Sequence, residues 1–426
     1  MAPKTCLIPL IATSAERNIK LLIDHQCPQC GAPAVLTDTD RLFTCEYCKV
    51  NSYLQQVGFF RYVLPHRAPA DTNLVYLPYW RFKGMLFASM IDGIHHKFTD
   101  ISYPAISSRH FPASIGLRSQ ALRLRFISPD MQGKFFHPQT PIEKILETVE
   151  NGFTKSLPRP ALYQSHIGES LSIIYSPFYI RDRVYDAILN KPVSPVLSED
   201  GLADSIPGGQ PDWGIRFLPT LCPSCGWDLE GRRDSLILIC RNCDSVWQPE
   251  RNKFRSIHFR HLTAKDGNAV FLPFWRIKAE ISGIRLKSYA DMVRIGNLPR
   301  VIQDGWENVE FCFWALAFKV RPEVFVRLNR NITLTQPQAP LIEGVPDGRI
   351  YPVNLPVNEA AESLKIILAS FMKPPGTLLP RLPRIEIRPK SFLLVFIPFQ
   401  DKHHELVHHN YRMAVNKNLL AMAKNL

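Results

Sequence analysis

The sequence predicts a β-rich α+β fold with few helices, arranged as a tandem duplication of one unit. Two observations support this prediction. The chain holds 36 prolines but only 21 glycines, and proline, which lacks an amide donor, suits strand edges and rigid turns better than helix interiors. Several motifs also occur twice in the same order. Because 46% of the 426 residues are hydrophobic, the chain can fold into two or three domains with cores of their own.

The most specific repeated motif is a pair of CxxC sequences. In both copies 14 residues separate the two pairs, and the copies lie 195 residues apart, from 27 to 222. Two tight CxxC turns present four thiolates to one tetrahedral ion, so the motif predicts a zinc ribbon in each half. Gly31 and Gly226 follow the leading pair, where such turns commonly need a positive φ. The predicted metal ligands are Cys27, Cys30, Cys45, Cys48, Cys222, Cys225, Cys240 and Cys243.

A site with four cysteine ligands leaves no coordination position for water or substrate, so both sites are predicted to be structural. Two zinc ions per chain are expected, with a single iron at each site, as in rubredoxin-like electron-transfer proteins, as the alternative. The second pair of each site lacks the glycine that rubredoxin-like turns usually carry, which favours zinc. Cys6 and Cys312 stand outside the motif and are expected to be small buried residues.

A second repeated motif predicts a β-sheet module behind each ribbon. Residues 73–83 match 268–278 at the same offset of 195, and 169–178 resemble 390–399 at an offset of 221. All four segments combine β-branched or apolar residues with an aromatic residue, any residue, proline and another aromatic residue, which is typical of buried strands. The second half therefore holds an insertion of about 26 residues, and the turn-rich segment 336–348 is expected to contain part of it.

The tryptophans and the basic residues of these strands are predicted to lie in different environments. Trp80 and Trp275 occupy matched positions and are expected to pack in the core. The cations that follow them are expected to lie on a solvated face, with a repeated anion-contacting row as the alternative. These cations are Arg81, Lys83, Arg276 and Lys278. Helices are expected at 140–153, 359–371 and 411–425.

These assignments divide the chain into six segments. One of them, residues 196–214, is predicted to be a linker because it is rich in glycine, proline and acidic residues. The C-terminal tail, residues 411–426, is expected to dock on its own domain or on a partner, with binding to an anionic membrane surface as the alternative. The segments are 20–56 (first zinc ribbon), 57–195 (first β-rich module), 196–214 (linker), 215–252 (second zinc ribbon), 253–410 (second β-rich module) and 411–426 (basic amphipathic C-terminal helix).

The order of these motifs resembles a known family. Tyr76-Leu-Pro-Tyr-Trp80 and Phe271-Leu-Pro-Phe-Trp275 each follow a four-cysteine motif, as in bacterial proteins that combine a zinc ribbon of the transcription factor IIB type with a strand like Tyr-Val-Pro-Tyr-Trp. The resemblance covers about half of the chain. It implies an accessory protein of a membrane-associated assembly without catalytic residues. Family members often add a transmembrane helix, but the longest apolar runs here, 311–320 and 392–399, are too short for one and predict buried strands.

Composition and motifs together favour a non-catalytic scaffold or adaptor subunit with protein partners. The sequence shows no phosphate-binding loop, nucleophile elbow or recognisable pair of carboxylates. The net charge of +13 also suits nucleic acid or an anionic membrane surface, and nucleic-acid binding is the main alternative. CxxC pairs in a chain without a predicted secretion signal indicate the cytoplasm, with a peripheral position at the inner face of the membrane as the alternative.

One motif points to an enzyme. The sequence His404-Glu-Leu-Val-His408 matches the HExxH of zinc metalloproteases, which requires a helix and a third metal ligand. No acidic residue follows Glu405 and no histidine follows His409. The corresponding segments of the other copies continue as strands, on which the two histidines would lie too far apart. We therefore expect 403–409 to form a solvated, histidine-rich edge.

Overall fold

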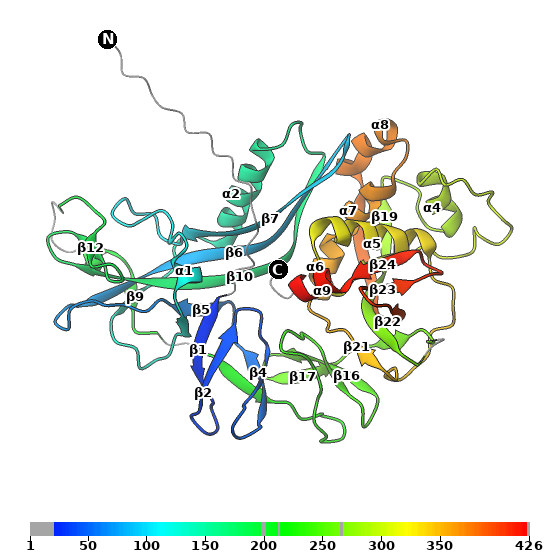
Figure 1. The fold of residues 1–426 in the computed structure, drawn as a ribbon. Helices are drawn as coiled ribbons and strands as arrows, with labels where there is room; N and C mark the ends of the chain where they lie inside the picture. Colours follow the sequence, from blue (N-terminus) through cyan, green and yellow to red (C-terminus); the bar gives the residue numbers. More distant parts are fainter. Residues whose placement is uncertain (1–20, 197–201, 212–213, 265–266, 424–426) are drawn as a thin grey trace, which may run out of the picture.

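Two long antiparallel strand pairs form the centre of the fold, one in each half of the chain (Figure 1). In the first half β6 (Leu74–Met90) pairs with β10 (Tyr163–Ile180), and in the second half β19 (Ala269–Ser282) pairs with β22 (Glu386–Asp401). The computed structural model describes residues 21–196, 202–211, 214–264 and 267–423. Over these residues strands predominate, which confirms the β-rich fold class.

The sheet of the first half contains 11 strands. Its main path runs β13-β9-β6-β10-β5-β8-β1-β2, while β7 pairs with β6, β11 with β10 and β12 with β11. The further strands of this sheet are β1 (Leu22–Gln26), β2 (Pro33–Thr37), β5 (Phe60–Val63), β7 (Gly93–Pro104), β8 (Leu124–Phe126), β9 (Lys134–Phe136), β11 (Val184–Asp186), β12 (Lys191–Pro192) and β13 (Gly208–Gly209).

The sheet of the second half has seven strands. Its main path is β20-β19-β22-β23-β24, with β18 on β22 and β21 on β19. Its other strands are β18 (Phe259–His261), β20 (Phe313–Leu316), β21 (Arg349–Ile350), β23 (Glu405–His408) and β24 (Met413–Asn416). Both apolar runs that were predicted to be buried strands contribute to this sheet, as β20 and as part of β22.

The two central strand pairs share one register. Pro78 lies opposite Tyr175 in the first sheet, and Pro273 lies opposite Phe396 in the second. These positions correspond at the two offsets found in the sequence. A short parallel strand flanks each long strand in both halves: β9 and β21 lie beside β6 and β19, and β5 and β18 lie beside β10 and β22.

The central prolines leave these ladders intact. The carbonyl oxygen of Pro78 accepts from the N–H of Ala105 (2.9 Å), and that of Pro273 accepts from the N–H of Ala317 (3.1 Å). The N and O atoms of one strand residue point to the same side. The proline nitrogens therefore face away from β10 and β22, so the missing amides remove no hydrogen bond from either central pair.

The two matched tryptophans are buried, as predicted. Trp80 Nε1 donates to the carbonyl oxygen of Thr140 (2.9 Å), and Trp275 Nε1 donates to that of Leu355 (3.1 Å). Each accepting residue directly precedes the proline that caps a helix, α2 (Ile142–Lys155) or α6 (Val357–Glu362). A buried indole N–H needs such an acceptor, and in both halves it holds the helix entry against the sheet.

Helices lie at two of the predicted positions. α2 corresponds to 140–153, and α6 together with α7 (Leu364–Phe371) corresponds to 359–371. The remaining helices of the described chain, apart from the tail, are α1 (Arg118–Ala121), α3 (Leu202–Ser205), α4 (Tyr289–Ile295), α5 (Pro322–Thr335), α8 (Pro375–Leu378) and the 3-10 helix η1 (Leu379–Arg384).

The C-terminal helix is shorter than predicted. Met413 and Val415 are buried on one face of β24, which pairs with β23, so strand pairing replaces the expected first turns of helix. Helix α9 occupies only Lys417–Met422. It packs on its own module, where the hydroxyl of Tyr351 donates to the carbonyl oxygen of Leu420 (3.0 Å). Residues 424–426 lie outside the described chain.

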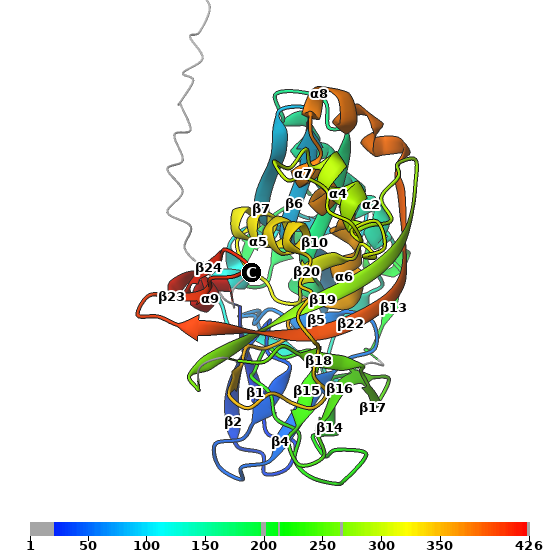
Figure 2. The ribbon, with the colours of Figure 1, turned by 90° about the vertical axis from the view of Figure 1, so that its right-hand side faces the viewer.

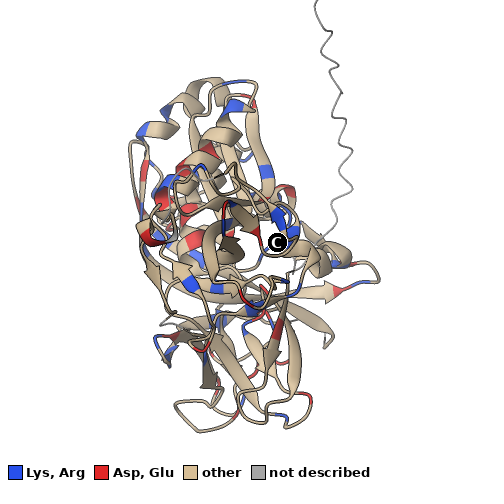
Figure 3. Ribbon diagram, turned by 90° about the vertical axis from the view of Figure 1, so that its left-hand side faces the viewer, with Lys and Arg blue, Asp and Glu red and all other residues tan. Residues whose placement is uncertain are grey.

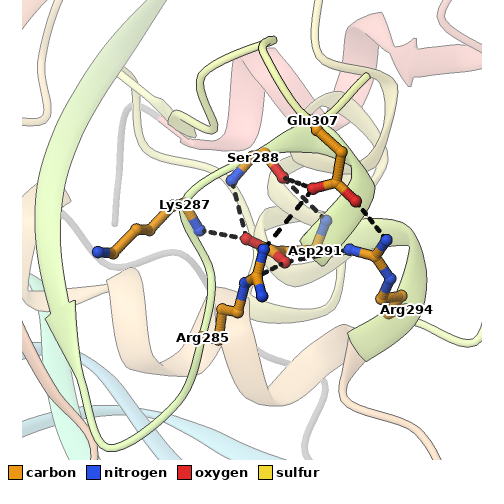
Figure 4. Close-up of polar contacts among 6 residues, drawn as sticks. All are labelled: Arg285, Lys287, Ser288, Asp291, Arg294 and Glu307. Atoms are coloured by element: carbon orange, nitrogen blue, oxygen red, sulfur yellow. Dashed lines mark hydrogen bonds and ion pairs between the residues drawn. The ribbon is translucent and has the colours of Figure 1, made fainter. Parts of the chain in front are cut away.

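Helix α4 is held at its start by a polar cluster in the second module (Figure 4). The Ser288 hydroxyl accepts from the Asp291 N–H (3.2 Å), and the Asp291 carboxylate accepts from the N–H groups of Lys287 and Ser288 (3.0 and 3.2 Å). Burial raises the pKa of Asp291, but these N–H groups and the nearby Arg285 outweigh it and hold the pKa below its usual value. This capping box fixes a helix that the sequence analysis did not predict.

The two modules share a hydrophobic core. Met85, Phe87 and Ile167 of the first half belong to the large apolar cluster of the second half, and the ring of Phe87 lies 5.9 Å from that of Phe325 in α5. Helices α5 and α7 contact β7, so the first sheet closes one side of the second module. Figure 2 shows these helices beside β6 and β7.

Part of the predicted linker joins the first sheet. Gly208 and Gly209 form β13, which pairs with Phe135 and Phe136 of β9. The described part of segment 196–214 is therefore tied to the first module, while residues 197–201 and 212–213 lie outside the described ranges.

Candidate metal centres

Each four-cysteine cluster is built from two turns at the ends of short strands. In the first ribbon, Cys27 directly follows β1 and Cys45 directly follows β3 (Leu42–Thr44), while β4 (Asn51–Gln55) begins three residues after Cys48. The second ribbon contains β14 (Arg216–Pro219), β15 (Leu238–Cys240), β16 (Ser245–Glu250) and β17 (Lys253–Ser256).

The turn geometry follows from the residue after each pair. Gly31 and Gly226 have φ of +72° and +74°, as predicted, and their N–H groups donate to the carbonyl oxygens of Cys27 and Cys222. Lys49 and Asp244 occupy the corresponding place after the second pairs and also have positive φ, 61° and 49°. All four turns therefore have left-handed backbone, and two of them do so without glycine.

The sulfur positions fit a tetrahedral metal ion. Within each cluster all four Sγ atoms lie within 4.8 Å of one another. Four thiolates at the zinc–sulfur distance of about 2.3 Å would stand about 3.8 Å apart, and a disulfide would need about 2.05 Å. Four Sγ–Sγ separations are near the value for a shared ion: 3.7 Å (Cys27–Cys48), 3.6 Å (Cys30–Cys45), 3.6 Å (Cys222–Cys243) and 3.5 Å (Cys225–Cys240).

The ionisation of the thiols in the second cluster also favours a bound cation. Burial raises the pKa of Cys222, but the N–H groups of Cys225 and Ser224 outweigh it and lower the pKa to about 6. Burial, with the nearby thiols of Cys225 and Cys243, raises the pKa of Cys240 to about 12. Without a counter-ion the four sulfurs cannot all ionise, whereas a bound metal ion takes four thiolates.

Burial differs within each CxxC pair. The first cysteine of every pair is buried, while the second is exposed or, at Cys243, half-buried. Large side chains on the same turns point outward: Tyr47, between the cysteines of its pair, is 69% exposed, and Trp227, two residues after Cys225, is 61% exposed. The metal positions therefore lie close under the surface, and aromatic rings stand on that surface.

The two ribbons pack against each other, which the sequence did not reveal. Strand β14 pairs antiparallel with β4, and the carbonyl oxygen of Arg233 accepts the N–H groups of both Arg41 and Leu42. Figures 1 and 2 show the ribbons together at one end of the molecule, next to both modules. One apolar cluster contains residues of both ribbons: Leu42, Tyr53, Cys222, Leu229, Leu238 and Cys240.

A buried ion-pair cluster attaches the first ribbon to the first sheet. Asp38, in the turn after β2, accepts from Arg81 (2.8 Å) and lies 3.5 Å from the Lys83 ammonium. Arg81 also forms two parallel bonds to Asp100 (2.8 and 2.7 Å). Burial raises the pKa of Asp38, but Arg81 and Lys83 outweigh it and lower the pKa to about 2.

The prediction of a solvated face is wrong for Arg81 and Lys83, which are each only 2% exposed. Strand alternation places both on the face of β6 that the first ribbon covers, and Asp38 and Asp100 supply the opposite charge there. Their counterparts differ: Arg276 is half-buried over the ring of Trp314, and Lys278 is exposed and pairs with Glu310.

The HExxH motif lies on strand β23, which pairs with β22 and β24, and on the turn before it. Glu405 begins β23, and His404 precedes it, so no helix presents the two histidines. The ring of His408 stacks on Tyr411 at 3.9 Å, and its Nδ1 accepts the Tyr411 N–H (3.2 Å). Among described residues, the only groups of three or more His, Cys, Asp or Glu placed to hold a metal ion are the two cysteine clusters. Cys312 is buried, as predicted, and Cys6 lies outside the described chain.

Fold and clusters together define a β-rich protein with two four-cysteine groups, each placed to hold a metal ion. Comparison with protein-family models, curated proteins and solved structures gives no match. In the described part of the chain no helix is both long and apolar enough to cross a membrane.

Proposed function

We propose that this chain is a non-catalytic scaffold or adaptor subunit that uses its two zinc ribbons to bind protein partners. The observation that carries the proposal is the pair of exposed aromatic side chains on the metal turns, Tyr47 and Trp227. Tyrosine and tryptophan are enriched among the residues that dominate binding energy in protein interfaces. A turn tied to a metal ion holds such a ring in place before binding, so little conformational entropy is lost.

The repeated strand register supports a tandem duplication. The opposed pairs Pro78–Tyr175 and Pro273–Phe396, the flanking parallel strands and the two tryptophan hydrogen bonds all recur at corresponding positions. Two ribbons on one chain offer two contact surfaces, although their exposed rings stand at different positions of the motif, since Asn242 and Ala32 occupy the places that correspond to Tyr47 and Trp227. Such an arrangement lets one chain engage two sites of an assembly at once.

Zinc is the metal that fits this proposal. Four thiolates fill the tetrahedral coordination of zinc, which leaves a structural site and no catalytic one. Elemental analysis of the purified protein is expected to give two zinc ions per chain. Iron in both sites would contradict this assignment and support an electron-transfer protein.

Affinity capture from the native cell tests the role of the exposed rings. The variant Trp227→Ala is expected to reduce recovery of a defined protein partner about tenfold, because truncating a central aromatic contact commonly costs more than 1 kcal/mol. The control is Leu117→Ala, which truncates an apolar side chain that is 71% exposed and outside both ribbons. Equal recovery by both variants would show that the ring at Trp227 is not the contact.

Nucleic-acid binding is the alternative, favoured by the net charge of +13. Figure 3 shows acidic positions among the basic ones over the face it presents. In the capture experiment, recovery that nuclease treatment abolishes would support the alternative. A cytoplasmic location also belongs to the proposal and is supported by clusters of free thiols suited to a reducing compartment.

A further inference from the structure

A polar pocket lies where the two ribbons meet the two modules. Its volume is about 380 Å³, and its lining includes Arg41 of the first ribbon, Gln248 of the second, Glu169 of the first module, and Lys319 and Glu359 of the second. Pockets that bind small molecules occur preferentially at such junctions between domains and commonly have volumes of this order. The pocket is far too small for a folded partner.

Lys319 is the distinctive residue of this pocket. Its main-chain N–H donates to Asn354 Oδ1 (2.8 Å), which fixes the backbone just after β20. The side chain is mostly buried, and its ammonium forms no hydrogen bond or ion pair with any described residue. An ammonium in such a partly enclosed position has no acceptor in the described part of the protein, so a ligand that supplied one would be stabilised there.

A second cation shares the pocket. The Arg41 guanidinium donates to the carbonyl oxygens of Asp38 and Asp40 (2.9 Å each) and lies 4.5 Å from the ring centre of Phe60. Those contacts orient it, yet it forms no ion pair with a described carboxylate. Burial lowers the pKa of Lys319; the carboxylate of Glu359 opposes this shift, while the positive charges of Lys83 and Arg41 add to it.

The acids of the pocket already have partners. Glu169 pairs with the imidazole of His166 (2.9 Å), and Asp234 accepts from the amide of Asn354 (2.7 Å). Glu359 accepts the N–H of Glu169 (3.0 Å). Burial raises the pKa of Glu359, although the positive charge of Lys319 opposes this shift. Among the described residues no ion pair joins Lys319 or Arg41 to any of these acids, so both cations remain available to a ligand.

We propose that this pocket binds a small ligand through an oxyanion, a phosphate or a carboxylate, with Lys319 as the main contact and Arg41 as the second. Hydrogen bonds from a cation to an oxyanion are short and about twice as strong as neutral ones. The site is separate from the metal clusters and does not depend on the scaffold role of the ribbons.

Thermal unfolding of the full, metal-loaded protein tests the site. Sodium phosphate and sodium succinate are titrated separately, with chloride holding the ionic strength constant. A ligand that binds only the folded state raises Tm with concentration, so one of the two series is expected to raise Tm along a saturating curve. The series that saturates at the lower concentration distinguishes phosphate from carboxylate as the preferred oxyanion.

The variant Lys319→Gln is expected to weaken this binding about tenfold or more, because it removes the charge and shortens the side chain. The matched control is Lys278→Gln, which removes an exposed lysine outside the pocket and should leave the curve unchanged. If Lys319→Gln does not fold with its full metal content, Arg41→Gln replaces it, with the same loss expected. Unchanged binding in the folded variant, or no saturating curve with either anion, overturns the proposal.

Discussion

Replacing Cys240 by serine is expected to lower the metal content from two ions to one per chain and to unfold the second ribbon. Cys240 is fully buried, and its sulfur lies 3.5 Å from that of Cys225 within the second cluster. A neutral hydroxyl is a poor substitute for a thiolate ligand. Structural zinc contributes about 10–16 kcal/mol to the folding of zinc-finger peptides, so losing the ion removes the main source of stability from this short segment.

The effect of this substitution should reach the first ribbon. Cys240 and Cys222 share an apolar cluster with Leu42 and Tyr53 of the first ribbon, and β14 forms a ladder with β4. Unfolding the second ribbon exposes that surface and frees the edge of β4. Elemental analysis measures the metal loss, and hydrogen exchange of the amides in Asn51–Gln55 should show reduced protection even though the first cluster is unchanged.

Cys312→Ala is the control for this experiment. Cys312 is buried in the core of the second module and belongs to neither cluster. Its removal takes away one thiol and costs some packing energy, but two metal ions per chain should remain. A Cys240→Ser protein that kept both ions, or a Cys312→Ala protein that lost one, would contradict the assignment of the ligands.

The features that the sequence predicted are those encoded by local spacing. Two CxxC turns separated by 14 residues constrain four sulfurs strongly, and the structure brings each set together. The repeated proline between aromatic residues marked the central strands, and in the structure Pro78 and Pro273 lie opposite residues that correspond at the two offsets found in the sequence. These patterns depend on residues close in the chain, or on a comparison of one half with the other.

The features that the sequence missed depend on contacts between distant segments. Alternation along β6 shows that Arg81 and Lys83 share a face, but nothing nearby shows that a ribbon carrying Asp38 covers it. The sequence also did not reveal the pairing of β14 with β4 or the pocket around Lys319, because both form between segments that are far apart in the chain. In the tail, pairing of β24 with β23 overrides a helical pattern up to residue 416.

The substitution Asp38→Asn is expected to destabilise the protein by about 3–5 kcal/mol at neutral pH, the usual cost of removing one partner from a buried ion pair. Asparagine has nearly the same shape as aspartate, so the loss of stability measures the removal of the charge and not a change in packing. Arg81 would keep Asp100, but Lys83 would lose its only ion pair among the described residues. Denaturant unfolding measures the change, and the exposed Asp304→Asn should alter stability by less than about 0.5 kcal/mol.

The pH dependence of this destabilisation identifies the carboxylate as its source. The pKa of Asp38 is about 2 in the folded protein and 3.8 when unperturbed. A lowered folded pKa means that the stabilisation is complete above about pH 4 and is lost as pH falls from about 4 towards 2. The stability difference between wild type and Asp38→Asn should therefore be constant from neutral pH to about pH 4 and narrow below it. Acid also releases metal from thiolates, but that loss is common to both proteins and cancels in the difference, so a gap that narrowed already near pH 6 would contradict the assignment to Asp38.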